Sequence, residues 1–383
     1  MVEENEIKNW DDLNLKDDLL RGIYSYGFEY PSEIQKKAIK HIINGSEIIA
    51  QAQSGSGKTG AFSISTLQCI DIDKRCTQAL IIAPTHELAK QISIVINNLG
   101  SMMNGLVIKT IIGGTSIKDE AIDLKKNPPH IIVGCAGRIY DMINRRHIKT
   151  SNIKLFVLDE ADEMLSKGFK EQIYNIFQTM NTHVKVILFS ATMPDEVIEL
   201  TNKFMVNPVK IIMKPEDLTL ECIQQFYVAT QCDDNKFEML QNLFSLISVS
   251  QCIIYCNSVS KVSELYEKMV KDDYSVCAIH GSMDKADREK TFYNFRNGNF
   301  RVLISSNITA RGIDIQQIST VINYDIPSCH NTYLHRIGRS GRWGRKGFAI
   351  NFVTRRDIFN MKKIEKHYNI DIKELPVNFK VVV

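Results

Sequence analysis

A glycine-rich loop followed by a lysine and a threonine carries the clearest chemistry in this sequence. Residues 52–59 read Ala-Gln-Ser-Gly-Ser-Gly-Lys-Thr and follow an apolar run that ends at Ala50. Glycines let backbone N–H groups turn toward a phosphate, Lys58 reaches the outer phosphates, and Thr59 can bind magnesium. A loop of this kind is often only a connection, but the preceding strand favours a phosphate site. The predicted nucleotide-binding residues here are Ser54, Gly55, Ser56, Gly57, Lys58 and Thr59.

Two adjacent carboxylates form the second feature with chemical potential. Residues 159–162 read Asp-Glu-Ala-Asp and directly follow the apolar run 155–158, and ligands of open α/β sheets bind at the carboxyl ends of strands. Asp159 can hold magnesium through water, while Glu160 can orient and polarise the water that attacks a γ-phosphate. One of these acids can also cap the following helix. Together with the loop, the pair predicts ATP hydrolysis with Mg²⁺, with Thr59 and Asp159 as metal ligands.

Short apolar runs are the elements that must position these motifs. Runs that end in small or polar residues are typical of buried parallel strands. Segments with helical spacing, residues 87–99 and 170–180, lie between them, so an α/β fold with right-handed crossovers is expected. The first series of predicted strands is 48–50, 79–82, 131–133, 155–158 and 186–189.

The same rhythm restarts after residue 250 and predicts a second α/β domain. Between the two series, Lys214 to Thr219 is polar and contains Pro215, which suits a linker. We therefore expect two domains, residues 1–215 and 216–383, each a mostly parallel sheet flanked by helices. The predicted strands of the second series are 252–255, 276–279, 302–304, 321–324 and 348–352.

The composition agrees with a two-domain enzyme. The chain has 383 residues, 44% of them hydrophobic and 24% charged, as in ordinary globular proteins. A net charge of +3 neither requires nor excludes nucleic acid. The nine cysteines include no Cys-x-x-Cys pair, which argues against a disulfide framework and a zinc site. An acidic N-terminus and no membrane-length apolar stretch lead us to expect a cytoplasmic protein with no membrane contact, and leave a nuclear pool open.

The Asp-Glu-Ala-Asp sequence and this type of phosphate loop resemble the DEAD-box RNA helicases, and the resemblance continues along almost the entire chain. It implies two tandem RecA-like domains, ATP and Mg²⁺ as cofactors, and RNA-stimulated ATP hydrolysis that drives local duplex unwinding. Residues 27–35 are similar to the family's adenine-reading Q motif, which implies that Tyr30 and Gln35 contact the base. Trp10 has the spacing of the family's upstream aromatic and would offer a stacking face, while the Gln35 amide offers a donor and an acceptor.

Further segments resemble motifs that complete the ATP site or couple it to RNA. Residues 190–192, Ser-Ala-Thr, are similar to the coupling motif, residues 310–314 to the motif whose aspartate binds ribose, and residues 335–342 to an arginine-rich motif. For residues 310–314, a surface salt-bridge cluster is the alternative. The implied catalytic residues are Lys58, Glu160 and the arginine fingers Arg339 and Arg342, the implied ribose ligand is Asp314, and the implied coupling residues are Asp162, Ser190, Thr192, Arg311, His335 and Arg336.

The resemblance implies an RNA path that reads the sugar–phosphate backbone with little sequence preference. The residues carried over to that path are Pro84, Thr85, His86, Gly113, Gly114, Gly137, Arg138, Asn257, Gly281, Arg288 and Ser306. This sequence departs from the family pattern there: His86 replaces an arginine, Cys135-Ala136 replaces Thr-Pro, Lys285 replaces a glutamine, and Ser306-Asn307 replaces Thr-Asp. We therefore expect intact nucleotide chemistry with altered RNA affinity or coupling, although Lys285 can restore charge lost at His86.

Within the family, residues 19–24, 168–174 and 217–221 look like the translation initiation factor 4A branch. That branch implies a cytoplasmic monomer that unwinds messenger RNA leaders with an initiation-factor scaffold protein. The alternative is a relative of the nuclear exon junction type, an ATP-gated RNA clamp with slow turnover. A DNA helicase or a metabolic P-loop ATPase is a third interpretation, which the full set of motifs disfavours.

Overall fold

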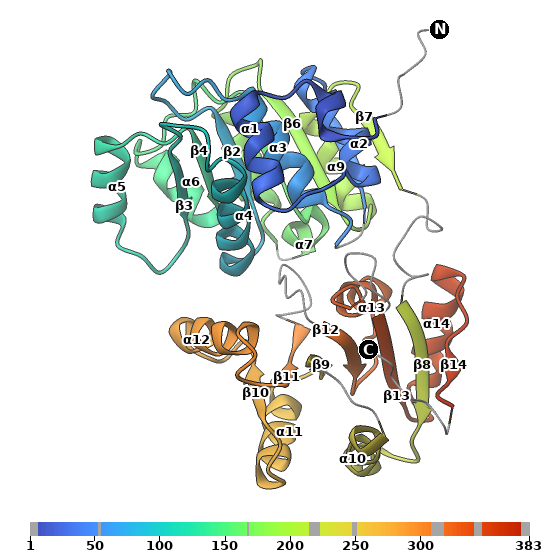
Figure 1. The fold of residues 1–383 in the computed structure, drawn as a ribbon. Coiled ribbons are helices and arrows are strands. Elements are labelled where there is room, and N and C mark those ends of the chain that lie inside the picture. Colours follow the sequence, from blue (N-terminus) through green and yellow to red (C-terminus); the bar gives the residue numbers. More distant parts are fainter. Residues whose placement is uncertain are drawn as a thin grey trace, which may run out of the picture. The chain divides into compact units, whose positions relative to one another are not determined.

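The computed structural model describes residues 7–52, 55–166, 168–213, 223–246, 251–307, 318–340 and 347–376. The chain divides into two compact units, Met1–Lys214 and Pro215–Val383, which are treated separately below (Figure 1). The predicted linker, Lys214 to Thr219, lies outside the described residues. Among the described residues, no helix combines the length and the apolar character needed to cross a membrane.

The first unit is built on a seven-stranded sheet with the order β3-β4-β2-β5-β6-β1-β7. Every pairing in this sheet is parallel. The central strands are continuous apolar runs buried on both faces, as expected for a parallel sheet between helical layers. Its strands are β1 (Ile48–Gln51), β2 (Ala79–Ile82), β3 (Ile108–Ile111), β4 (Ile131–Gly134), β5 (Leu155–Leu158), β6 (Lys185–Ser190) and β7 (Val209–Ile212).

Helices cover both faces of this sheet, because successive residues of a strand point to opposite sides. Leu188 of β6 packs in a cluster with residues such as Ile173 and Leu200. The next residue, Phe189, instead contacts the ring of Phe62, with 5.5 Å between ring centroids. The helices are η1 (Trp10–Leu13), α1 (Asp17–Ser25), α2 (Glu33–Ile43), α3 (Lys58–Cys69), α4 (His86–Leu99), α5 (Ile117–Lys126), α6 (Ala136–Asn144), α7 (Ala161–Ser166), α8 (Lys170–Gln178) and α9 (Asp195–Phe204).

The second unit repeats this architecture with its own seven-stranded sheet, in the order β10-β11-β9-β12-β13-β8-β14, again entirely parallel. The expected pair of parallel sheets flanked by helices is therefore confirmed. The strands are β8 (Ile223–Ala229), β9 (Gln251–Tyr255), β10 (Val276–Ile279), β11 (Val302–Ser305), β12 (Ile318–Asn323), β13 (Gly347–Val353) and β14 (Lys373–Glu374).

The second sheet is also covered on both faces. Ile254 packs in a cluster with Leu265 of α11, whereas Ile253 packs in a separate cluster with Phe295 of α12. A third cluster joins Ile337 and Ile364 to the β13 side of the sheet. The helices are η3 (Asp233–Asn235), α10 (Lys236–Leu246), α11 (Val259–Lys271), α12 (Lys285–Arg296), α13 (His330–Ile337) and α14 (Ile358–Tyr368).

Candidate functional site

The phosphate loop connects the carboxyl end of β1 to the start of α3. Helix α3 begins at Lys58, and Gly57 before it has a φ of 99°, a left-handed conformation that favours glycine. A Cβ at Gly57 would lie 2.6 Å from Ser32 Oγ and 2.9 Å from Gln35 Nε2. The loop therefore needs glycine there for conformation and for space. Residues Gln53 and Ser54 lie outside the described part of the chain.

Two side chains at the start of α2 hold this loop. Ser32 Oγ donates to the carbonyl of Ser56 at 2.8 Å, and Gln35 Nε2 donates to the carbonyl of Gly57 at 3.2 Å. Gln35 Oε1 accepts from the backbone N–H of Ser32 at 2.7 Å. The segment predicted to read adenine is thus tied directly to the segment predicted to hold phosphate.

Trp10 departs from its predicted role. Its side chain is 0% exposed, its Nε1 donates to the carbonyl of Phe28 at 3.0 Å, and its ring stacks on that of Phe28 with centroids 6.1 Å apart. A ring with no accessible surface has no face to offer to a base, so Trp10 supports the Q-motif segment from behind. Tyr30, which is 70% exposed, has a free face.

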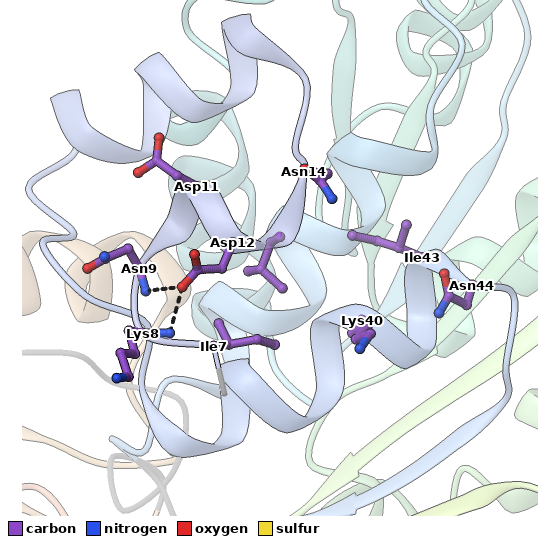
Figure 2. Close-up of a pocket in the computed structure, with 10 residues that line it drawn as sticks. Ile7, Lys8, Asn9, Asp11, Asp12, Asn14, Lys40, Ile43 and Asn44 are labelled. Carbon is purple, nitrogen blue, oxygen red and sulfur yellow. Dashed lines mark hydrogen bonds between the residues drawn. The ribbon is translucent and has the colours of Figure 1, made fainter. Parts of the chain in front are cut away.

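A hollow of about 900 Å³ lies beside the turn that contains Trp10 (Figure 2). Asp12 Oδ2 accepts hydrogen bonds from the backbone N–H groups of Lys8 at 2.8 Å and Asn9 at 2.9 Å and so fixes this turn. The hollow is also lined by Ile43 at the end of α2, whereas Gln35 lies in the first turn of that helix. It is therefore separate from the phosphate loop.

The paired carboxylates follow β5 at the same edge of the sheet as the phosphate loop. Burial, together with the Glu160 carboxylate, raises the pKa of Asp159 to about 7 even though the Lys58 ammonium opposes this rise. Glu160 has a φ of 51°, an uncommon conformation for a residue with a side chain. The turn thus presents Glu160 in a fixed, strained orientation.

The residues present fit a nucleotide phosphate group and a magnesium ion. Lys58 Nζ and Glu160 Oε2 are buried and have no hydrogen-bond partner among the described residues. Buried polar atoms are normally paired, so such orphans indicate groups that meet a ligand. Thr59, in the first turn of α3, is half-buried and supplies a hydroxyl beside them.

The predicted coupling residues of the first unit contact one another. Thr192 Oγ1 donates to Asp162 Oδ2 at 2.6 Å, and Ser190 Oγ accepts from the backbone N–H of Asp162 at 3.3 Å. The end of β6 is thereby bonded to the turn that carries the catalytic carboxylate candidates. Two hydrogen bonds thus hold these segments together.

The predicted RNA residues of the first unit gather at the carboxyl ends of β2, β4 and β3, which are neighbours in the sheet. Pro84 is buried in the segment after β2, and Thr85 caps α4 by accepting from the N–H of Leu88 at 3.2 Å. His86 approaches Gly113 closely: a Cβ at Gly113 would lie 3.2 Å from His86 Nε2. The exposed glycines of this edge are Gly114 and Gly137.

Arg138 is engaged within the protein. Its Nη2 donates to the carbonyl of Thr115 at 2.7 Å, and its Nη1 lies 3.4 Å from Glu120 Oε2, an ion pair without hydrogen-bond geometry. Cys135, where the family carries threonine, makes no side-chain hydrogen bond to the first turn of α6. The pairing of Arg138 reduces the free positive charge at this edge.

Arg336 organises the predicted residues of the second unit. It is fully buried, its Nη2 donates to Asn257 Oδ1 at 2.7 Å, and its Nη1 donates to the carbonyl of Asp325 at 2.8 Å. Asn307 Oδ1 accepts from both Nε, at 2.9 Å, and Nη2, at 2.6 Å. Arg336, an implied coupling residue, therefore ties together the segments after β9, β11 and β12 inside its own unit.

The remaining predicted residues of the second unit are placed as follows. His335 and Arg339 are buried, and Arg339 Nε donates to the carbonyl of His335 at 3.2 Å. Gly281 follows β10 and is exposed. The backbone N–H of Ser306 donates a hydrogen bond to the carbonyl of Ile279 at 3.3 Å. Arg288 lies on α12 and is half-buried. Arg311, Asp314 and Arg342 lie outside the described residues.

Two residues that matter for these sites were not singled out from the sequence. Ser32 binds the phosphate loop, and its position three residues before Gln35 is the signature of a capping box, which α2 has. Asp325 anchors the segment after β9 by accepting from the backbone N–H of Asn257 at 3.0 Å. No sequence pattern marks Asp325, because its partners are distant in the chain.

Comparisons with known proteins agree with this arrangement. Residues 32–200 match the DEAD/DEAH box helicase family, and residues 235–344 match the helicase conserved C-terminal domain. The chain is 52% identical over 370 residues to Eukaryotic initiation factor 4A of Caenorhabditis elegans, covering 97% of this chain and 92% of that one. It is 52% identical over 375 residues to the ATP-dependent RNA helicase eIF4A of Debaryomyces hansenii, covering 98% and 94%.

A solved structure supports the same assignment at the level of the fold. S. cerevisiae Dbp5 bound to RNA and ADP BeF3 superposes with a TM-score of 0.89 at 34% identity, with 96% of each chain covered. Because family matches cover both units and the identity extends along nearly the full length, this chain belongs to the DEAD/DEAH box helicase family.

Proposed function

We propose that this protein is an ATP-dependent RNA helicase that acts in translation initiation. The observation that carries the chemistry is that Lys58 Nζ and Glu160 Oε2 are buried without a hydrogen-bond partner among the described residues. They accompany a phosphate loop in which Gly57 adopts a positive φ. The role in initiation is supported by 52% identity to relatives named initiation factor 4A. Those names favour the helicase over a slow clamp of the exon junction type.

In this proposal, the first unit binds ATP and prepares a water for attack. Backbone N–H groups of the loop and the Lys58 ammonium bind the phosphates, and Glu160 orients the attacking water. Thr59 and Asp159 are the residues that would hold Mg²⁺, which neutralises developing charge on the phosphates. Arg339 and Arg342 are proposed as arginine fingers, and Asp314 as the ribose ligand.

Base recognition is proposed to rest on Tyr30 and Gln35. The exposed ring of Tyr30 offers a stacking surface. Gln35 already donates to Gly57 and accepts from Ser32, so it would sense a base and the phosphate loop together. Trp10 would act through the position of Phe28.

RNA is proposed to follow the carboxyl edges described above, through its backbone. Asp162, Ser190 and Thr192 would couple that path to the ATP site, because they bond the carboxylate turn to the end of β6; Arg311 and His335 are assigned to coupling by family resemblance. Because histidine, unlike the arginine of the family pattern, carries no permanent charge at position 86, and because Arg138 is paired with Glu120, we propose weakened phosphate binding in the first unit. A His86→Arg variant should bind single-stranded RNA more tightly and with a steeper salt dependence, and an unchanged affinity would count against this idea.

We further propose a cytoplasmic monomer that works with an initiation-factor scaffold protein, with a nuclear pool left open. The support is the relatives' names alone, and co-purification with initiation factors followed by mass measurement of the isolated protein would test it. A stable homodimer, or partners confined to the nucleus, would contradict this part of the proposal.

The decisive test of the enzymatic proposal is ATP hydrolysis with and without single-stranded RNA. We expect strong stimulation by RNA and its loss in Glu160→Gln, which replaces a carboxylate by a neutral amide of nearly the same shape. Nucleotide binding by the variant should persist, since Lys58 and the loop are unchanged. Binding of ATP without stimulation by RNA would refute the coupled mechanism.

A further inference from the structure

A basic pocket lies at the amino ends of the strands of the first sheet, whereas the phosphate loop lies at their carboxyl ends. Its volume is about 540 Å³, and its walls are the segments that precede β2, β4 and β5 together with the end of α5. The phosphate loop and the acidic pair instead follow the carboxyl ends of β1 and β5. Since all these strands are parallel, the pocket lies at one end of the strands and the nucleotide residues lie at the other end.

The rim of this pocket is positively charged. Its lining includes Arg75, Lys125, Arg146 and Lys149 and no aspartate or glutamate. The whole chain has 47 lysines and arginines against 44 acids, so a lining without acids departs from the average surface. None of these four cations forms an ion pair with another described residue, whereas their neighbours Lys74 and Arg145 pair with Asp71 and Asp141.

The floor of the pocket is apolar and its walls are fixed. Leu124 and Ile148 line it and keep 6% and 4% of their surface exposed, while Pro129 is buried and Ile132 is 0% exposed. Thr77 Oγ1 donates to the carbonyl of Pro129 at 3.1 Å and ties one wall to the next. The pocket is therefore preformed, with an apolar base and a cationic rim, and its volume lies within the range of about 300–1,000 Å³ typical of ligand sites.

This chemistry favours a peptide over a nucleic acid. Proteins that bind unpaired bases stack them mainly on aromatic rings, and the lining contains no phenylalanine, tyrosine or tryptophan, with His147 as its single aromatic ring. An aliphatic floor suits a bulky apolar side chain, and unpaired cations around it suit flanking carboxylates. Both requirements are met by one short peptide that carries acids on each side of an apolar anchor.

We propose that this pocket is a docking site for an acidic linear peptide of a partner protein. An apolar side chain of the peptide packs on Leu124 and Ile148 at the floor of the pocket. Carboxylates of the peptide pair with the cations of the rim, Arg75, Lys125, Arg146 and Lys149. The proposal is independent of the nucleotide chemistry, because no lining residue belongs to the proposed ATP or RNA sites. It assigns the first unit a protein-binding face at the end of the sheet opposite the phosphate loop.

The test is fluorescence anisotropy with the full chain and a labelled peptide in which three glutamates flank each side of a Leu-Phe pair. We expect saturable binding that weakens with added salt. The double variant Arg146→Glu, Lys149→Glu should raise the Kd at least tenfold. Ala121→Trp, which keeps every charge but fills the floor, should raise it at least fivefold, since Ala121 lines the pocket.

The matched control is Lys203→Glu, Lys210→Glu, which makes the same change in net charge at exposed positions on α9 and β7. Strand β7 forms the far edge of the sheet from β3. The control should leave the Kd within twofold of the wild type. Equal losses in control and pocket variants, or a floor variant that binds normally, would overturn the proposal. A ten-nucleotide oligouridylate that loses affinity in the pocket variants while the peptide does not would replace it with an RNA site.

Discussion

Asn307 accepts two hydrogen bonds from Arg336 through a single oxygen: Oδ1 lies 2.9 Å from Nε and 2.6 Å from Nη2. Arg336 is fully buried, and this burial lowers its pKa to about 10. The ring of Tyr255 lies 5.2 Å from the guanidinium carbon and offers partial compensation. A neutral amide therefore serves a buried cation at the position where the family pattern has a carboxylate.

Asn307→Asp should stabilise the second unit. A carboxylate supplies one oxygen to each of Nε and Nη2, the fork geometry that guanidinium prefers, and Asn307 is exposed, so the new charge is not fully desolvated. We expect the free energy of unfolding to rise by about 1 kcal/mol. Urea unfolding followed by circular dichroism measures the change, and Asn307→Ala should lower stability instead. An aspartate variant no more stable than the alanine variant would show that charge at Arg336 is already compensated.

Trp10 and Tyr30 should separate stability from nucleotide binding. Trp10→Ala removes a fully buried ring and its hydrogen bond to Phe28, and should destabilise the first unit by about 3–5 kcal/mol. Tyr30→Ala removes an exposed ring and should leave stability nearly unchanged while weakening ATP binding. Thermal unfolding and nucleotide titration on both variants test this. If Trp10→Phe lowered the affinity for ATP and left the stability unchanged, Trp10 would have to be a direct contact of the base.

Gly60→Ala should disturb Gln35 without unfolding the protein. The added Cβ would lie 2.5 Å from Gln35 Nε2 and 3.1 Å from the Phe28 ring, so the flexible amide must leave the Gly57 carbonyl. We expect ATP affinity in the absence of RNA to fall at least fivefold. Gly137→Ala is the control, because it is also helical and a Cβ there meets nothing within 4 Å. Equal ATP affinities for the two variants would argue against the link between Gln35 and the phosphate loop.

Asp325 should make the second unit sensitive to acid. Burial raises its pKa, but the N–H of Asn257 and the ammonium groups of Lys261 and Lys236 outweigh this and hold the pKa below its usual value. A carboxyl with a lowered folded-state pKa stabilises the fold above its unfolded pKa near 3.8, and that contribution disappears as the pH falls through the folded-state value.

Asp325→Asn should therefore lower stability at pH 7 and flatten its loss below pH 4. The loss at neutral pH should be about 3–5 kcal/mol, because Lys236, with a side chain 2% exposed, would lose its buried partner. Asp233 and Asp357, at 2.8 and 3.8 Å from Lys236 Nζ, remain. Urea unfolding at several pH values measures this, with the surface variant Asp141→Asn as control. An acid profile identical to the wild type would exclude Asp325 as the titrating group.

Strands that are buried along nearly their whole length were predictable from the sequence, including the edge strand β10, whereas partly exposed strands were not. Runs such as 79–82 and 302–304 are aliphatic throughout, since both faces are covered, and the structure has strands there. Strands β3, β7, β8 and β14 were missed, because each is partly exposed and places polar residues among its apolar ones or, as in β14, is only two polar residues long. Partial exposure relaxes the demand for apolar side chains that makes a strand recognisable.

For the site, local motifs were predictable and long-range contacts were not. The glycine-rich loop and the acidic pair follow β1 and β5 as expected, because strand, turn and helix are adjacent in sequence. The position of Trp10 behind Phe28, and of Asn307 beneath Arg336, depends on residues 18 and 29 positions away. Spacing alone could not distinguish a ring that contacts the ligand from a ring, such as that of Trp10, that packs behind the ligand-binding segment.

The most direct test of the central claim is displacement of the shorter strand from an RNA duplex of about ten base pairs, roughly one helical turn. The wild-type protein should release the strand with ATP but not without it, and Glu160→Gln should bind the duplex and ATP yet fail to sustain release over repeated turnovers. Release that is independent of ATP, or equally sustained in Glu160→Gln, would contradict a helicase driven by hydrolysis at this site.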